Sequence, residues 1–234
     1  MSISRYCLPI ASEFIDHDKC YVENGTGYLS YKIGNAELLN AISEFKNKVT
    51  EVITSAIKYD EEDFILAAEL LTAVAGKDEY DFDAVDPDQF LIVQPYRAIM
   101  EDKGICQEIA GEYIYYLLQV GINATTCDGM TKDQEAHVWT VVELDGEHYH
   151  VDPTFTLQYK DSLAFFCIDD DMREQYGDFD ADDFVYADSD IIHYEIHDQK
   201  YKDLWGAESY TIDRENRIIY TETFYSGEEK EYRY

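Results

Sequence analysis

Basic side chains are scarce in this sequence of 234 residues. Eighteen lysines and arginines stand against 50 aspartates and glutamates, which leaves a formal net charge of −32 at neutral pH. So few cations cannot displace the counterions of a phosphate backbone, and an anionic membrane would repel the chain. The composition therefore argues against nucleic acid and membrane partners. The acidity is explained most simply by solubility, and a more specific interpretation is attraction of a basic substrate or partner.

Long apolar runs are also missing. No stretch approaches the roughly 18–20 apolar residues that span a bilayer. Residues 1–14 contain no extended apolar segment of the kind found in signal peptides. We expect a cytoplasmic protein by default, or a secreted one if a leader was removed. Because 46% of the residues are apolar, the chain can still bury a sizeable core and should be globular.

Paired cysteines are absent. The five cysteines are an odd, scattered set with no Cys-x-x-Cys pair, so they indicate neither a disulfide framework nor a zinc site. Isolated thiols are the default interpretation, and one of them is free to act as a nucleophile. These cysteines are Cys7, Cys20, Cys106, Cys127 and Cys167.

Helices are predicted where apolar residues recur every three or four positions. The predicted helices, with the glycines expected to end the last two, are 36–58, 61–75 (Gly76) and 105–120 (Gly121). The first 30 residues are irregular, with a turn signal at 24–27, and the acidic segment 77–89 is predicted to be loop.

Strand-like alternation replaces the helical period after the third helix. Residues 136–152 form two predicted strands joined by Asp145-Gly146, one of the strongest hairpin signals. Further strands are predicted at 162–168, 208–213 and 217–225. Because the helices come largely first and the strands largely last, the order favours an α+β fold over alternating α/β.

Three short stretches contain the residue types of thiol chemistry. G-I-C-Q-E-I-A-G-E-Y places Cys106 in the first turn of the third helix, where free N–H groups and the helix dipole stabilise a thiolate. E-A-H-V-W-T-V-V places His137 at the start of a strand, and H-Y-H-V-D-P-T places Asp152 at the end of its partner. Alone, each has an ordinary explanation as a buried thiol, a core histidine or a turn aspartate. Together they predict a nucleophile, a base and its orienting group.

The hairpin turn also predicts which residues face each other. If Asp145 and Gly146 are the two loop residues, Asp152 lies opposite Trp139 and His137 lies opposite Thr154. Asp152 and His137 then point to the same face as diagonal neighbours, and the carboxylate can bind one imidazole nitrogen. A register shift of one residue would separate the two side chains.

These stretches resemble the core motif of the transglutaminase-like superfamily, in particular its bacterial-type cysteine protease and amidase domains. In that family a cysteine begins a helix, a histidine followed by an aromatic lies on a strand, and Asp-Pro-Thr ends the next. The resemblance covers roughly residues 94–175. It implies a papain-like cysteine-proteinase fold, a Cys106–His137–Asp152 triad and no required organic cofactor. By the same analogy, Tyr96 or Gln94 would complete an oxyanion hole with the Cys106 N–H, and Trp139 would line the substrate pocket or the core.

The predicted function is thiol acyl transfer, with hydrolysis of a peptide or related amide through a thioester favoured. Amine transfer of the transglutaminase type, a non-catalytic peptide- or glycan-binding module and an acidic adaptor remain alternatives. We expect one domain over residues 1–234: a mainly helical part (1–90), the catalytic core (91–168) and an acidic segment with C-terminal strands (169–234). The oligomeric state has no signal in the sequence.

Metal sites are the weaker interpretation of the remaining polar residues. His150 falls on the same face as Asp152, but no further ligand has suitable spacing. His193 and His197 are four apart without a glutamate following the first histidine. The aspartate-rich run 169–183 lacks the spaced ligands of a calcium loop. No metal is therefore predicted.

Overall fold

The fold is α+β, as predicted. The computed structural model describes residues 8–85, 95–186, 195–223 and 227–234. The helices are α1 Pro9–Phe14, α2 Asn35–Ala56, α3 Asp63–Lys77, α4 Pro95–Glu101, α5 Cys106–Gln119, α6 Pro153–Thr156 and α7 Asp170–Gln175. The strands are β1 Tyr21–Glu23, β2 Thr26–Tyr28, β3 Glu79–Tyr80, β4 Lys103–Gly104, β5 Ala124–Met130, β6 Ala136–Leu144, β7 Glu147–Val151, β8 Val185–Tyr186, β9 Ala207–Asp213, β10 Ile218–Thr223 and β11 Glu229–Arg233.

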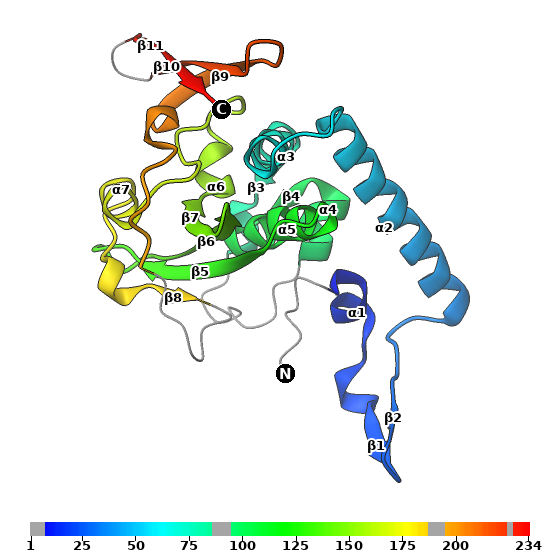
Figure 1. Cartoon of the computed structure of the whole chain (residues 1–234). Coiled ribbons are helices and arrows are strands. Elements are labelled where there is room, and N and C mark those ends of the chain that lie inside the picture. Colours follow the sequence, from blue (N-terminus) through cyan, green and yellow to red (C-terminus); the bar gives the residue numbers. More distant parts are fainter. Residues whose placement is uncertain (1–7, 86–94, 187–194, 224–226) are drawn as a thin grey trace.

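An antiparallel sheet in the order β7-β6-β5-β8 forms the centre of the molecule (Figure 1). Helix α5 packs against β5 and β6, and α3 packs against α5. A second antiparallel sheet, β11-β10-β9, is built from the C-terminal residues. Strands β3 and β4 form a short parallel pair directly before α5. The start of α5 is therefore held by the sheet, by α4 and by this short pair.

The β6–β7 hairpin has the predicted register. Leu144 pairs with Glu147, and the ladder continues to Thr140 opposite Val151. Asp145 and Gly146 both have positive φ, 55° and 84°, as a two-residue type I′ turn requires. The ladder stops at the Thr140–Val151 pair. Contrary to the prediction, Asp152 and Thr154 therefore do not pair with Trp139 and His137 of β6. Pro153 has no N–H to donate, and the chain turns into α6.

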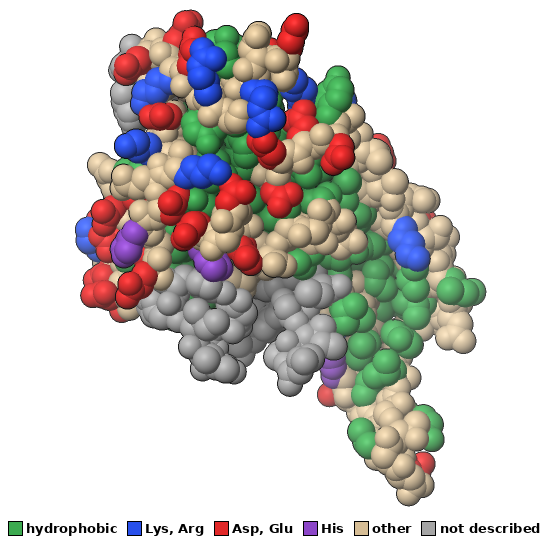
Figure 2. Space-filling model, in the orientation of Figure 1, with side chains coloured by type: hydrophobic (Ala, Val, Ile, Leu, Met, Phe, Trp, Pro, Cys, Tyr) green, Lys and Arg blue, Asp and Glu red, His purple; other side chains and the backbone are tan. Residues whose placement is uncertain are grey.

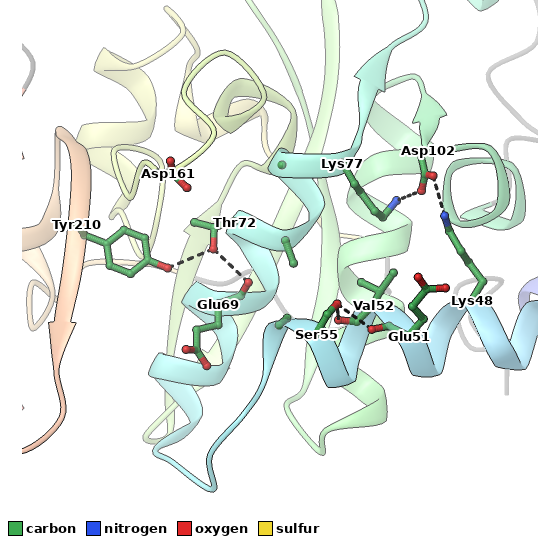
Figure 3. A pocket seen from close by; sticks show the side chains of 13 residues that line it. Lys48, Glu51, Val52, Ser55, Glu69, Thr72, Lys77, Asp102, Asp161 and Tyr210 are labelled. Carbon is green, nitrogen blue, oxygen red and sulfur yellow. Dashed lines mark hydrogen bonds and ion pairs between the residues drawn. The ribbon is translucent and has the colours of Figure 1, made fainter.

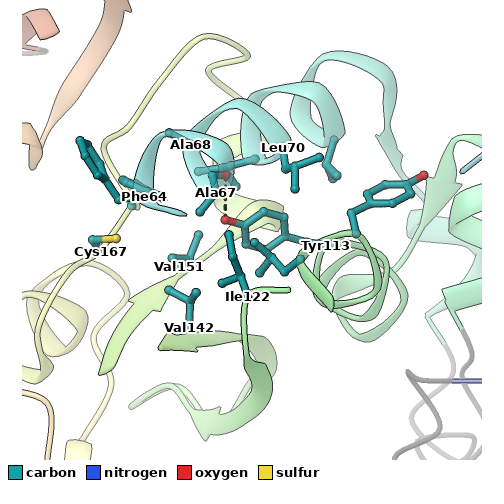
Figure 4. Close-up of a cluster of buried hydrophobic side chains, with 14 of the residues drawn as sticks. Phe64, Ala67, Ala68, Leu70, Tyr113, Ile122, Val142, Val151 and Cys167 are labelled. Atoms are coloured by element: carbon teal, nitrogen blue, oxygen red, sulfur yellow. Dashed lines mark hydrogen bonds between the residues drawn. The ribbon is translucent and has the colours of Figure 1, made fainter. Parts of the chain in front are cut away.

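The core joins both sheets to the helices. Tyr113 of α5 is fully buried, and its hydroxyl donates a hydrogen bond to the Ala67 carbonyl of α3 at 2.9 Å (Figure 4). Val142 and Val151 of the central sheet lie in the same cluster, which extends to Tyr232 of β11. This packing fixes α5 relative to the hairpin, and it includes residues from all three predicted parts of the chain.

Several predictions for local structure were wrong, among them the irregular first 30 residues, which contain α1, β1 and β2. Residues 162–168 are not a strand, because the Ser162 hydroxyl accepts the Ala164 N–H in a turn and Cys167 has a positive φ of 53°. Only an isolated bridge, Ile168 to His150, remains of that strand. Helix α3 does not end at Gly76 but continues to Lys77, whose amine pairs with carboxylates beyond the helix. The predicted loop 77–89 contains β3.

The surface carries charge on the body and apolar side chains on one extension. Figure 2 shows acidic side chains interspersed with basic ones over the upper body, and apolar side chains along the region of α1 and α2. The β1–β2 hairpin extends away from the body, with Tyr21, Val22 and Tyr28 exposed. Among the described residues, no helix is both long and apolar enough to cross a bilayer.

Candidate functional site

Cys106 is the first residue of α5 and lies where a reactive thiol would be useful. The Glu108 carboxylate accepts the Ile105 N–H at 3.0 Å and is held in place by Arg97, which fixes the start of the helix. Cys106 packs with Ala110 and Val138, and 7% of its surface is exposed. The first N–H groups of a helix have no partner within it, so they favour negative charge at this position.

His137 and Asp152 meet beside Cys106. The His137 Nε2 lies 2.8 Å from the Asp152 Oδ2, and both side chains are buried. Asp152 also caps α6, since its Oδ1 accepts the Phe155 N–H at 2.9 Å. The contact forms because the correct hairpin register brings the end of β7 beside β6. With Nε2 committed to Asp152, Nδ1 is the nitrogen available to Cys106.

Opposite charges perturb both groups of this pair. Burial alone would lower the pKa of His137, but the charge and hydrogen bond of Asp152, together with a hydrogen bond to Cys106, raise it to about 9. Burial alone would raise the pKa of Asp152, but His137 and Arg173 outweigh it and hold that pKa below its usual range. A protonated imidazole beside an ionised carboxylate is thus the favoured state at neutral pH.

Arg173 completes the surroundings of Asp152, a role that no motif in the sequence indicated. This side chain of α7 is fully buried, and its Nη2 lies 2.8 Å from the Asp152 Oδ2. Its guanidinium carbon lies 4.2 Å from the ring centre of Trp139 and 4.4 Å from that of Phe179. The only signal was that Arg173 is the one basic residue in the acidic run 169–190.

Tyr80 is a second residue that the sequence did not indicate. Strand β3 pairs Tyr80 with Gly104, two residues before the thiol, and the Tyr80 ring packs on the cluster around Cys106. Burial, followed by the charge of Cys106 and a hydrogen bond with it, raises the pKa of Tyr80 to about 12. A neutral hydroxyl donor therefore lies beside the sulfur.

Of the predicted pocket residues, Tyr96 lies elsewhere and Trp139 takes the core position that was its alternative. Tyr96 sits on the face of α4 toward α1 and α2, where its ring packs against Phe14 and Phe45 at centroid distances of 5.2 and 5.7 Å. Trp139 is fully buried, and its indole N–H donates to the His150 Nδ1 at 2.8 Å. Trp139 is therefore a core residue behind His137 and not a pocket surface. Gln94 lies outside the described residues.

The other polar residues considered for a metal have different partners. His150 accepts from Trp139 and donates from Nε2 to the Asp170 carboxylate at 2.8 Å. Burial lowers the pKa of His150, which agrees with a neutral ring that uses both nitrogens. Within the described part of the chain, no three His, Cys, Asp or Glu side chains are arranged to hold a metal ion. His193 lies outside that part.

A groove of about 550 Å³ lies between α2, α3 and β9 (Figure 3). Both of its lysines pair with one carboxylate: Lys48 lies 2.7 Å and Lys77 lies 2.9 Å from Asp102. The Tyr210 hydroxyl is 3.2 Å from that of Thr72. The residues that line the groove include none of the three predicted site residues. The groove is therefore separate from Cys106.

Comparisons with known proteins give a partial likeness. No family model matches this chain, and no curated protein matches it. A TGase structure aligns with a TM-score of 0.42 at 11% identity, covering 65% of this chain and 48% of that one. A candidate cysteine protease from Cytophaga hutchinsonii aligns with a TM-score of 0.41 at 12% identity, covering 72% of this chain and 61% of that one. This chain thus spans about half to three fifths of the length of these two proteins, to which it is similar.

Proposed function

We propose that this protein is a thiol acyl-transfer enzyme that hydrolyses a peptide or related amide. The observation that carries the proposal is the buried contact of 2.8 Å between His137 and Asp152 beside Cys106 at the start of α5. A nucleophile, a base and an orienting carboxylate within reach of one another are the groups required for this chemistry. No metal or organic cofactor enters the proposed reaction.

The proposed reaction has two halves, and His137 moves a proton in each. In the first half, His137 holds the proton of the Cys106 thiol on Nδ1, and the Cys106 sulfur bonds to the amide carbon. The carbon–nitrogen bond then breaks, the leaving amine takes the proton from Nδ1, and a thioester remains. In the second half, His137 takes a proton from water, the hydroxide oxygen bonds to the thioester carbon, and the sulfur leaves with that proton returned to it.

The developing oxyanion needs hydrogen-bond donors near Cys106. We assign this role to the backbone N–H of Cys106 and the hydroxyl of Tyr80. The contact of Tyr80 with the cluster around Cys106 supports this choice, and its neutral hydroxyl is able to donate. Tyr80 therefore takes the role that the family resemblance suggested for Tyr96.

Selective alkylation tests the nucleophile. With iodoacetamide in small excess, peptide mass spectrometry should find Cys106 modified first, although Cys20 is more exposed. Cys106→Ala should remove the fast phase and leave the melting temperature nearly unchanged. Cys20→Ala is the matched control, and it should keep the fast phase. A fast phase that persists in Cys106→Ala would rule out Cys106 as the reactive thiol.

Turnover is tested with a panel of blocked peptide amides. Release of amine or ammonia by the wild-type protein, and its loss in Cys106→Ala and His137→Gln, is the expected result. An added primary amine that becomes incorporated into the peptide would identify transfer in place of hydrolysis. Amide hydrolysis undiminished in Cys106→Ala would end the proposal.

A further inference from the structure

The contacts of Arg173 indicate a role in the candidate site beyond that of a structural ion pair. It is buried completely, and its contacts are the triad carboxylate, the Tyr176 carbonyl at a long 3.4 Å and three aromatic rings. Among the residues that the structure describes, its Nε has no hydrogen-bond partner. Burying an arginine with so few bonds is costly, because desolvation of a charge usually exceeds the gain from one ion pair.

The geometry around Asp152 shows what Arg173 does to the carboxylate. Oδ1 accepts the Phe155 N–H, while Oδ2 lies 2.8 Å from both the His137 Nε2 and the Arg173 Nη2. Two cationic groups therefore share one oxygen. Arg173 binds the same carboxylate oxygen as His137, and its positive charge opposes a second positive charge on the imidazole.

We propose that Arg173 is a positioning residue that fixes Asp152 toward His137 and weakens the hold of the imidazole on its proton. This inference rests on the proposed function. In that reaction His137 must release its proton to the leaving amine, and too strong a pairing with Asp152 would retain it. Arg173 offsets part of that pairing while it keeps the buried carboxylate ionised.

The other charged groups around His137 do not provide this effect. Cys106 of α5 and Asp152 after β7 both favour the imidazolium, and Arg173 of α7 opposes it. Tyr80 of β3 presents a neutral hydroxyl. Asp170, on the same helix as Arg173, is bound to His150.

A histidine titration by NMR tests the inference. Ring carbon-bound proton signals are followed in ¹³C-histidine-labelled protein, and His137→Gln assigns the His137 signal. Arg173→Met should raise the titration midpoint of His137 by about one pH unit or more, because a nearby positive charge is lost. Arg214→Met is the matched control: Arg214 stacks on Tyr59 and pairs with Glu61 and Glu69. Arg214→Met should leave the titration midpoint of His137 unchanged.

A midpoint that is unchanged or lower in Arg173→Met would overturn the inference. If that variant does not fold, the wild-type protein still gives an answer, since the guanidinium proton signals of Arg173 should shift as His137 titrates. Signals that do not shift would equally overturn it. The titration does not depend on turnover. A wild-type protein without fast Cys106 alkylation would refute the proposed function alone, and an unshifted midpoint would refute the role of Arg173 alone.

Discussion

The His137–Asp152 pair should make the protein less stable as the pH rises from about 6.5 to 9. The pKa of His137 is about 9 in the folded chain, against roughly 6.5 when unfolded. Between these values the folded state holds a proton that the unfolded state has lost, so the stabilisation is complete below the lower value and disappears above the higher one. A difference of about 2.5 pH units corresponds to about 3 kcal/mol of unfolding free energy.

Urea denaturation at closely spaced pH values between 6 and 10 measures this effect, with His137→Gln as the comparison. The comparison is needed because burial and Glu112 raise the pKa of Asp78 to about 9, and that group also loses stabilisation over this range. The difference in unfolding free energy between wild type and His137→Gln isolates the His137 contribution. It should shrink by about 3 kcal/mol from pH 6.5 to 9. A difference that stays constant across this range would refute the electrostatic picture of the site.

Three further outcomes are expected. A Cβ on Gly129 would lie 2.6 Å from the Trp139 Cη2, so Gly129→Ala should cost about 1–3 kcal/mol in a denaturation series and slow Cys106 alkylation. A Cβ on Gly76 of α3 meets open space, so Gly76→Ala should raise the unfolding free energy by up to about 1 kcal/mol. Equal changes in stability for Gly76→Ala and Gly129→Ala would contradict the close packing of Gly129 on Trp139. Tyr80→Phe should lower kcat about 100-fold with KM little changed, and an unchanged kcat would remove Tyr80 from the oxyanion hole. Because the net charge is −32, peptides with flanking lysines should show a higher kcat/KM than glutamate-flanked ones at low salt, a difference that should shrink at high salt.

Local signals in the sequence were sufficient for the hairpin and the helix that bear the predicted site. Asp145-Gly146 fixes the turn type, and the turn type fixes the register that brings His137 near Asp152. The helical period and the glycine at position 121 bounded α5 closely, since the structure has Cys106–Gln119. Both features depend on residues adjacent in sequence, where turn chemistry and periodicity act directly.

Residues that reach the site through tertiary contacts could not be predicted in this way. Tyr80 lies in a two-residue strand whose parallel partner is more than twenty residues later, too short to produce any alternation. The family resemblance suggested Tyr96, but its position on α4 directs the ring toward Phe45. Residues 162–168 have strand-like composition, yet a positive φ at Cys167 breaks the ladder. For Tyr80 and Tyr96, a long-range contact decided the outcome over local preference.

The acidic run 169–190 shows why composition can conceal a functional residue. Ten acidic side chains and one arginine suggest a solvated segment, and five of the aspartates among the described residues are exposed: Asp171, Asp178, Asp180, Asp182 and Asp183. The fold instead uses Asp169 as the cap of α7, through the Met172 N–H at 2.9 Å, and Asp170 as the partner of His150. These contacts orient α7 so that Arg173 points inward to Asp152. If stability alone had governed this position, an apolar side chain between Trp139 and Phe179 would serve as well or better. The arginine is therefore best explained by the carboxylate that it holds.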